Sequence, residues 1–393
     1  MSMPAGDNSK VEMLGLEAPQ FDALVAGWGL PKFRAQQVRD WVFGRAVTDV
    51  SAMSNLSRLD RDKLSELIQV AASRVVTQQI SEDGTQKLLL QWDPAKSAPI
   101  SPTAEAKAPA QAETVMIPDG DRRTACVSSQ VGCPVGCKFC ASGMEGVKGN
   151  LTAGQIVEQI IRLNQAMATP QTPNSQRSTL NSQLSGKPEK INSIVFMGMG
   201  EPLANYANVM QAVRVLHDPK GLNIGARKIT ISTVGVPKRI RDLANEELPL
   251  NLAISLHAPS EGLRKSLIPW AEHFSIDEII EAARFYFDKT GREITFEYIL
   301  LSGINDKAEH ARALSQVCQT LRANVNLLRY NEVESLPFKR PKADAVMQFQ
   351  EVLRRNGVNA HVRKSRGRDI TAACGQLRRR ENEANEGLVQ LGA

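Results

Sequence analysis

The chain has 393 residues, of which 42% are hydrophobic and 23% are charged, and its formal net charge is +6. This composition is typical of a globular protein and excludes a fibrous or largely disordered chain. No apolar run approaches the roughly 20 residues of a membrane helix, and the polar start lacks the apolar core of a signal peptide. We therefore expect a cytoplasmic protein without a membrane partner. The basic excess is compatible with RNA binding, although many enzymes share it.

Residues 1–75 are predicted to form a small helical accessory domain. Apolar residues recur at near-helical spacing in 20–28, 33–43 and 59–72. Gly29 and Pro31 interrupt the helical pattern between the first two segments. Basic residues lie among these helices. The domain either contacts nucleic acid or simply caps the larger domain, and the sequence leaves both interpretations open.

Residues 76–118 are predicted to contain short strands around a polar insertion. The strand candidates of this region are 74–79, 87–92 and 113–117. The insertion, about 93–111, is rich in Ala, Pro, Ser and Lys, and a second polar stretch spans about 168–190. We expect both to be solvated or disordered loops that carry no chemistry.

From residue 119 to residue 380, strand and helix patterns alternate, which predicts βα units and a parallel sheet. The strand candidates are 124–128, 193–197, 228–233, 251–256, 293–300 and 324–329, and the helix candidates are near 152–166, 205–217, 236–245, 275–289, 306–322 and 342–356. Six repeats are too few for a closed eight-fold barrel. The predicted fold class is therefore α/β, with a partial (β/α)6 barrel whose catalytic groups gather at the carboxyl ends of the strands. Residues 381–393 are expected to form a flexible tail.

Three closely spaced cysteines are the strongest chemical signal in the chain. Cys133, Cys137 and Cys140 lie in the run C-P-V-G-C-K-F-C. Three thiolates can ligate three irons of a [4Fe-4S] cluster and leave the fourth iron open. A structural zinc site needs a fourth ligand nearby, and residues 141–150 contain no Cys or His. A zinc site or three incidental thiols are the alternatives.

This cysteine spacing, with Phe139 before the third cysteine, resembles the signature of radical S-adenosylmethionine (radical SAM) enzymes. In those enzymes the methionine amine and carboxylate of SAM chelate the open iron, and the partial barrel is their fold. The run G-M-G-E-P-L, which contains Gly200 and Glu201, resembles their motif for the SAM amino group. Without this context, G-x-G-E is a common turn between a strand and a helix.

Polar residues at the ends of other predicted strands extend this candidate SAM site. Ser232 ends one strand, Ser255, Leu256 and His257 end another, and Asn331 follows the sixth. Such side chains can hydrogen-bond a ribose, a carboxylate or an adenine. Each of them alone would more often cap a strand end, but their joint placement favours a binding site.

Four motifs together resemble those of the RlmN/Cfr family of radical SAM RNA methyltransferases, which methylate adenosine at an unactivated ring carbon. The motifs are T-A-C-V-S-S-Q-V-G-C-x3-C-x2-C, F-M-G-M-G-E-P-L, A-I-S-L-H-A-P and A-A-C-G-Q-L. The resemblance extends over nearly the whole chain. It implies a [4Fe-4S] cluster and SAM as cofactors. It also implies rRNA as a partner, tRNA as a further substrate in some members, and an electron donor such as flavodoxin. We expect a monomer.

The resemblance also implies roles for three residues outside the cysteine triplet. Cys374 accepts a methyl group from one SAM. A radical derived from a second SAM then removes a hydrogen atom from this S-methyl group, and the resulting methylene radical adds to the adenine ring. Glu113 matches a proposed proton acceptor. Cys126 then attacks the Cys374 sulfur, which gives a disulfide and releases the methylated RNA. The attacking groups must be thiolates. Cys318 is interpreted as a buried hydrophobic residue.

Basic residues precede Cys374, and they either engage phosphate, favour the thiolate or form a solvated face. They are Arg363, Lys364, Arg366 and Arg368.

The family divides by target carbon. The helical N-terminal extension, F-M-G-M-G-E-P-L and G-R-D-I-x-A-A-C-G-Q-L resemble the carbon-2 branch more than the carbon-8, Cfr-type branch. The sequence of residues 332–341 differs from the one expected after the Asn331 position in the best-known family members. Two other classes stay open: a radical SAM enzyme acting on a small molecule or peptide, and an RNA-binding module with a structural metal. Neither requires the Cys126 and Cys374 pair.

Overall fold

The computed structural model of the chain describes residues 10–92, 110–168 and 189–377. Most of the two predicted polar insertions, and the whole predicted tail, lie outside these residues. Residues 110 and 111, which the sequence places in the first insertion, instead begin a strand. The chain divides into two compact units, formed by Met1–Arg74, Thr152–Lys190 and Ala207–Ile224, and by Val75–Leu151, Ile191–Tyr206 and Gly225–Ala393.

The first unit consists mainly of helices. They are α1 (Ala18–Gly27), α2 (Phe33–Arg45), α3 (Arg58–Leu67), α4 (Ala153–Ala168) and α6 (Tyr206–His217). Helix α1 begins with a capping box, in which the Glu17 backbone N–H donates to the Gln20 side chain at 2.9 Å. Helix α3 begins at the Ser57 hydroxyl, which accepts from the Asp60 N–H at 3.1 Å. These caps explain why the helices begin where polar residues precede the apolar pattern.

The prediction of a helix over 59–72 is wrong at its end. Helix α3 stops at Leu67, and β2 (Ile68–Gln69) pairs in parallel with β1 (Val11–Glu12). Ile68 and Val70 are buried and continue the apolar pattern, but they are β-branched residues that suit an extended backbone. The periodicity alone could not show that a distant strand provides their hydrogen-bond partners.

The second unit contains a ten-stranded sheet with the order β14-β13-β12-β11-β10-β9-β6-β5-β4-β3. Its strands are β3 (Arg74–Ile80), β4 (Gln86–Trp92), β5 (Ala110–Asp119), β6 (Arg122–Cys126), β9 (Ser193–Phe196), β10 (Ile229–Thr233), β11 (Asn251–Ser255), β12 (Ile294–Leu300), β13 (Ala323–Arg329) and β14 (Asn359–Arg363). Neighbours from β6 to β14 are parallel, whereas β4, β5 and β6 pair antiparallel. The hairpin of β7 (Gln130–Gly132) and β8 (Val147–Asn150) is separate.

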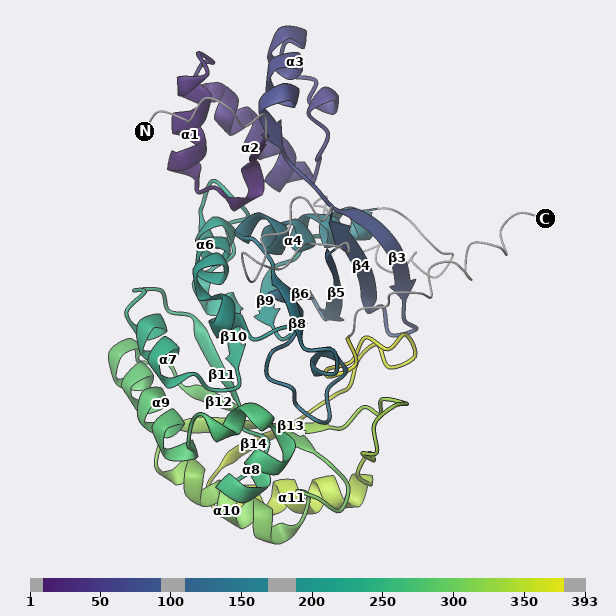
Figure 1. Cartoon of the computed structure of the whole chain (residues 1–393), viewed down its shortest axis with the longest axis vertical. Helices are drawn as coiled ribbons and strands as arrows, with labels where there is room; N and C mark the ends of the chain where they lie inside the picture. Colours follow the sequence, from purple (N-terminus) through teal and green to yellow (C-terminus); the bar gives the residue numbers. More distant parts are fainter. Residues whose placement is uncertain (1–9, 93–109, 169–188, 378–393) are drawn as a thin grey trace, which may run out of the picture. The chain divides into compact units, whose positions relative to one another are not determined.

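Helices of the second unit lie along the outer side of the parallel strands (Figure 1). They are α7 (Pro237–Ala244), α9 (Ile276–Thr290), α10 (Ala308–Gln319) and α11 (Ala343–Arg355). Helix α8 (Glu261–Leu267) instead contacts the segment of residues 133–140, where the Lys138 N–H donates to the Leu267 carbonyl oxygen at 3.0 Å. Short 3-10 turns occupy Met13–Gly15, Val50–Ala52, Ala141–Gly143, Pro202–Asn205, Ala226–Lys228 and Pro269–Glu272. In the described part of the chain, no helix has both the length and the apolar character that crossing a membrane requires.

The predicted α/β partial barrel is confirmed, with two additions that the sequence analysis missed. Strand β14 adds a seventh parallel strand, and α8 is an extra helix. Strand β14 reads N-A-H-V-R, which offers only two apolar residues, and α8 is polar and contains Gly262. Neither segment has a pattern strong enough to predict it.

Alternation along the strands creates a polar inner face. In β12, Ile294, Phe296 and Tyr298 are fully buried on one side, whereas Thr295 and Glu297 line a cavity on the other. Successive strand residues point to opposite faces. The sheet therefore presents short polar side chains on its inner side, where a closed barrel would have a packed core.

Candidate active site

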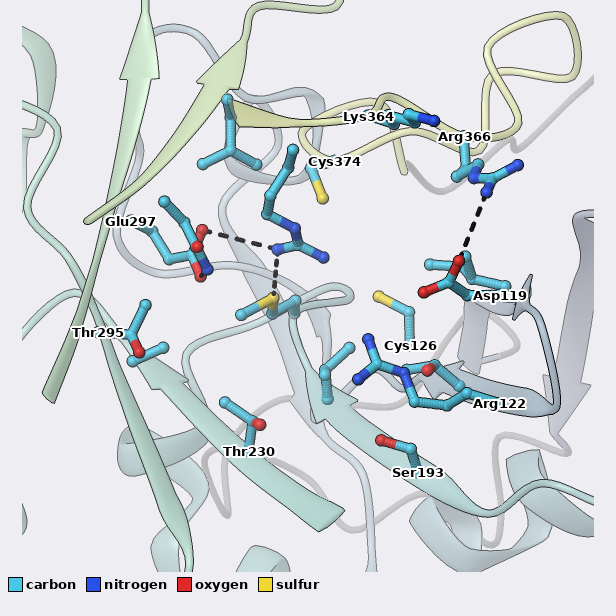
Figure 2. Close-up of a pocket in the computed structure, with 18 of the residues that line it drawn as sticks. Asp119, Arg122, Cys126, Ser193, Thr230, Thr295, Glu297, Lys364, Arg366 and Cys374 are labelled. Atoms are coloured by element: carbon cyan, nitrogen blue, oxygen red, sulfur yellow. Dashed lines mark hydrogen bonds and ion pairs between the residues drawn. The ribbon is translucent and has the colours of Figure 1, made fainter. Parts of the chain in front are cut away.

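A cavity of about 880 Å³ lies on this inner face. It extends from residues at the amino ends of the strands, such as Lys228 and Glu293, to Asn331 and Cys374 at the carboxyl ends. Figure 2 shows that the Cys126 and Cys374 thiols both point into it, and that Thr230, Thr295 and Ser193 line its floor. Its volume is in the range of ordinary ligand sites.

The structure brings Cys126, at the end of β6, close to Cys374, which is 248 positions further along the chain (374 − 126). Both cysteines are free thiols. Burial and, to a smaller extent, a charge on Cys374 raise the pKa of Cys126 to about 12, although Arg363 opposes the shift. Burial also raises the pKa of Cys374, again against Arg363. Each thiol therefore depends on this one cation if it is to become a nucleophile.

Arg363 ends β14 and reaches between the strands. Its Nη1 lies 3.6 Å from Glu297 Oε2 and donates to the Met197 sulfur at 3.5 Å (Figure 2). Glu297 also accepts from Asn326 at 2.9 Å. Burial lowers the pKa of Arg363, but Cys374, Glu297 and Cys126 outweigh it and raise the value. The guanidinium therefore stays charged beside both thiols.

The sequence analysis named Arg363 only as part of a basic run, and it missed Glu297. A single charge inside the apolar strand I-T-F-E-Y-I-L was the available signal. Of the basic run, Arg363, Lys364 and Arg366 line the cavity. Lys364 is exposed and the other two are partly buried, so these residues line the cavity and remain in contact with solvent.

The three clustered cysteines lie against an apolar group that includes Val135, Phe139 and Ile268. Burial raises the pKa of Cys133 to about 12, with a further contribution from the charge of Cys140. Burial and the two neighbouring sulfurs also raise the pKa of Cys137. These thiols therefore stay protonated until a metal ion binds and replaces the protons.

The donor set suits iron and sulfide, because three thiols come from one loop and none is used in a disulfide. Within residues 10–92, 110–168 and 189–377, no three His, Cys, Asp or Glu side chains are already arranged to hold a metal ion.

The Glu201 side chain ties the G-M-G-E-P-L turn to two backbone N–H groups. Glu201 Oε1 accepts from the Leu203 N–H at 2.9 Å and its Oε2 accepts from the Val234 N–H at 2.8 Å. Burial raises the pKa of Glu201 to about 7. Gly200 has φ +101°, and a Cβ there would lie 2.7 Å from the Cβ of Gln130. This glycine is therefore explained by close packing within the protein as well as by the expected approach of a ligand.

The other expected SAM contacts surround the cysteine loop. The Gly200 backbone N–H donates to the Cys133 sulfur, and the His257 ring packs edge-on against Phe139 with centroids 5.2 Å apart. His257 has φ +58°, and its Nδ1 accepts from the Ile299 N–H at 3.1 Å. Burial lowers the pKa of His257 to about 3, so the imidazole is neutral.

Ser255 ends β11 as predicted and Leu256 follows it, whereas Ser232 is the last residue but one of the neighbouring β10. The 880 Å³ cavity is lined by Asn331 but not by Gly200, Glu201, Ser232, Ser255, Leu256 or His257. The expected SAM contacts therefore divide between the cavity and the cysteine loop.

The loop that carries Cys374 is fixed against the cysteine loop. The Ala141 N–H donates to the Gly375 carbonyl at 2.8 Å, and the Ser142 hydroxyl donates to the Leu377 carbonyl at 2.6 Å. The Asn331 amide donates to the Cys374 carbonyl at 3.5 Å. The iron-binding candidates and the methyl-carrying candidate are thus neighbours in the fold.

The segment 332–341 supports this arrangement. The Gln376 amide donates to the Glu332 carbonyl at 3.0 Å, and Arg340 donates to Asn331 Oδ1 at 2.9 Å. The unusual sequence of this segment therefore occurs where the chain holds Asn331 and the Cys374 loop in place.

Glu113 lies on β5 in an ion pair with Lys87 on β4, at 2.9 Å, and both side chains are almost fully buried. Val115 pairs with Cys126, so Glu113, two residues away, is on the same face of the sheet. It does not line the cavity. Lys87 was missed as a functional candidate, although a lone lysine before three leucines in a strand was a signal.

Comparisons with known proteins agree over most of the chain. Residues 11–70 match the family model of the ribosomal RNA large subunit methyltransferase N-terminal domain. A probable dual-specificity RNA methyltransferase RlmN from Dictyoglomus turgidum is 38% identical over 367 residues, which is 93% of this chain and 96% of the relative. The corresponding protein of Salinibacter ruber is 42% identical over 371 residues, 92% and 91% of the two chains.

The chain belongs to the RlmN family of radical SAM RNA methyltransferases.

Structure comparison supports the same conclusion. A crystal structure of a radical SAM methyltransferase from Sphaerobacter thermophilus has a TM-score of 0.82 and 37% identity, and the alignment covers 94% of this chain and 99% of the other. The predicted RlmN resemblance, the enzyme class and the cofactors of the family, a [4Fe-4S] cluster and SAM, are thereby confirmed. The roles of the individual residues stay predictions.

Proposed function

We propose that this RlmN-family chain methylates carbon 2 of an adenosine in 23S rRNA, through an S-methylcysteine on Cys374 and with two SAM per turnover. The observation that carries the proposal is the pair of Cys126 and Cys374 thiols in one cavity, with the buried Arg363 cation beside both. A radical SAM enzyme without a thiol-borne methyl group does not need this pair. The N-terminal match to a ribosomal RNA methyltransferase domain supports rRNA as the substrate.

Cys133, Cys137 and Cys140 would hold the cluster, and the polar strand ends would hold SAM. The contacts proposed for SAM are Gly200, Glu201, Ser232, Ser255, Leu256, His257 and Asn331. Bound together, the cluster and SAM supply a methyl group and the one-electron chemistry that removes a hydrogen atom from it. His257 is neutral and accepts from the Ile299 N–H, and Glu201 accepts from the Leu203 N–H, so that both side chains are fixed in position.

Cys374 and Cys126 perform the covalent steps of the proposal. As a thiolate stabilised by Arg363, Cys374 accepts the methyl group and later bonds to the adenine ring through that carbon. The resulting radical adduct must lose one electron, which the oxidised cluster would accept, and Glu113 takes the proton that leaves the ring carbon. The Cys126 thiolate then attacks the Cys374 sulfur, so that a disulfide forms while the sulfur–carbon bond breaks and the product leaves. An external thiol must reduce the disulfide before the next turnover.

Basic side chains on the cavity rim fit an RNA substrate. Arg122, Lys364 and Arg366 lie around its opening in Figure 2, and Arg227 and Lys228 line its other end. Lysine and arginine bind the phosphate backbone, and a base that is to react must leave its stack. The cavity offers a place for such an extruded adenosine.

Further parts of the proposal concern partners and setting. The relatives are named dual-specificity enzymes, which supports a tRNA substrate beside rRNA. We also propose a monomer that receives electrons from a donor such as flavodoxin and works in the cytoplasm, where these RNAs are.

Nucleoside mass spectrometry tests the proposed function. The reconstituted protein is incubated without oxygen with SAM, a reductant and rRNA that lacks the modification, and the digest is compared with 2-methyladenosine and 8-methyladenosine standards. We expect 2-methyladenosine. The 8-methyl product would assign the chain to the carbon-8 chemistry, and SAM cleavage with neither product, on rRNA or on tRNA, would point to a substrate other than RNA.

A further inference from the structure

Lys87 links the predicted proton acceptor to the loop that carries Cys374. Its Nζ lies 2.9 Å from Glu113 Oε1 and donates to the Thr371 carbonyl oxygen at 3.2 Å. Lys87 and Glu113 are each only 3% exposed. Burying a charge is costly unless it is paired, and this ion pair offsets part of that cost for both groups.

At the Cys374 loop, Lys87 contacts a residue with an unfavourable backbone conformation. Thr371 has φ +52°, a left-handed backbone that a β-branched residue rarely adopts. Residues in such regions persist where their surroundings hold them, often at functional sites. The Lys87 ammonium provides a charge-assisted hydrogen bond to the carbonyl of this residue, three positions before Cys374.

The turn between β3 and β4 holds the same loop from the outside. The Ser81 hydroxyl donates to Asp369 at 2.6 Å, and the Gly367 N–H donates to Asp83 at 3.1 Å. Gly367 has φ +62°, and a Cβ there would lie 2.9 Å from the Thr85 side chain. These contacts anchor the loop without involving Glu113. Of the contacts described here between the β3–β4 hairpin and the Cys374 loop, the one from Lys87 differs from the others, because the same ammonium also pairs with the Glu113 carboxylate.

We propose that Lys87 is a positioning residue for the deprotonation step: it holds the Glu113 carboxylate fixed relative to the Cys374 loop. This inference rests on the proposed function. Before that step the radical adduct must lose one electron, which the oxidised cluster would accept. The C–H bond of the ring carbon then breaks, its electron pair stays in the ring, and a Glu113 oxygen takes the proton. Loss of Lys87 should therefore stop turnover after the RNA has bonded to Cys374 and before Cys126 can release it.

The test resolves the reaction into stages in Lys87→Met, with Glu113→Gln and Lys87→Arg beside it. Methylation of Cys374, formation of 5′-deoxyadenosine, the covalent protein–RNA adduct and 2-methyladenosine are measured separately. In Lys87→Met we expect a product yield about 100-fold lower, the typical scale of general acid–base catalysis. The adduct should accumulate, as in Glu113→Gln, while Cys374 methylation stays near the wild-type level. Lys87→Arg keeps the charge and should recover part of the product.

Several outcomes would overturn the inference. They are wild-type product yield in Lys87→Met, or a parallel loss of Cys374 methylation, which a purely structural role predicts. Ser81→Ala loosens the loop without touching Lys87, and an equal accumulation of adduct in it would also contradict the inference. If Lys87→Met does not fold, Lys87→Gln replaces it, with the same expected stage of arrest. A wild-type protein that makes no methyladenosine would instead refute the proposed function.

Discussion

Two groups of thiols in this chain differ in what surrounds them. Cys133, Cys137 and Cys140 are partly buried in an apolar setting where neighbouring sulfurs raise one another's pKa. Cys126 is buried and Cys374 is partly buried, but Arg363 opposes the rise in their pKa. A metal can replace the protons of the first group. The second group must react as free thiolates, and the protein supplies the cation that this requires.

The largest expected effect comes from removing either thiol of the pair. Cys374→Ala, reconstituted with its cluster, should make no methylated adenosine, because the methyl group has no sulfur to occupy. Cys126→Ala should instead trap RNA covalently on Cys374, which denaturing gels and mass spectrometry detect. Cys318→Ala, a buried cysteine outside the site, is the matched control. Methylation by Cys374→Ala, or absence of the adduct in Cys126→Ala, would disprove the two-cysteine mechanism.

Removing the cation tests the contrast between the two thiol groups directly. Arg363→Met should slow methyl transfer to Cys374 on the order of tenfold or more, since each unit of pKa is tenfold in thiolate at a given pH. The rate is measured by peptide mass spectrometry in single-turnover experiments. Arg363→Lys should retain much of the rate.

Arg366→Met is the matched control, because Arg366 lies at the rim with Asp119, 3.8 Å away, as its partner. It should weaken RNA binding and leave Cys374 methylation intact. Equal effects of both substitutions would show that Arg363 acts through general charge and not through its position.

On the cluster side, Glu201 predicts a pH dependence of stability. Its pKa of about 7 in the fold exceeds the ordinary 4.5 because the group is buried. The folded state therefore holds a proton that the unfolded chain releases. Stability should fall as pH rises from about 4.5 to 7, by up to about 3 kcal/mol. Urea unfolding of the cluster-free protein measures the slope, and Glu201→Gln should flatten it; the same slope in both proteins would contradict the assignment.

The smallest expected effect concerns the anchor of the Cys374 loop. Gly367→Ala should destabilise the protein by about 1–2 kcal/mol for the left-handed backbone, and further because the new Cβ would lie 2.9 Å from both the Ala372 and the Thr85 side chains. Gly357→Ala is the matched control, because Gly357 has φ +77° but no atom within 4 Å of a Cβ there. Thermal unfolding compares the two, and an equal loss would show that these close contacts carry no cost.

Most strands and helices follow from local patterns in the sequence. Strand β12 alternates buried and cavity-facing residues, and α9 begins at the Ser275 and Glu278 capping box. One of the failures has a local cause and another has a distant one. Strand β14 offers only Ala360 and Val362 as apolar residues, and the end of α3 depends on a partner strand more than 50 positions earlier.

By itself the sequence determined the chemistry of the cluster motif, because all three cysteines lie within eight consecutive residues and no folding is needed to bring them together. It also carried the family, through motifs that are each continuous in the chain. Only the tertiary structure decided which charges serve the other thiols. Arg363, Glu297 and Lys87 come from three separate strands, and burial in the fold gives a lone charge its influence on its neighbours.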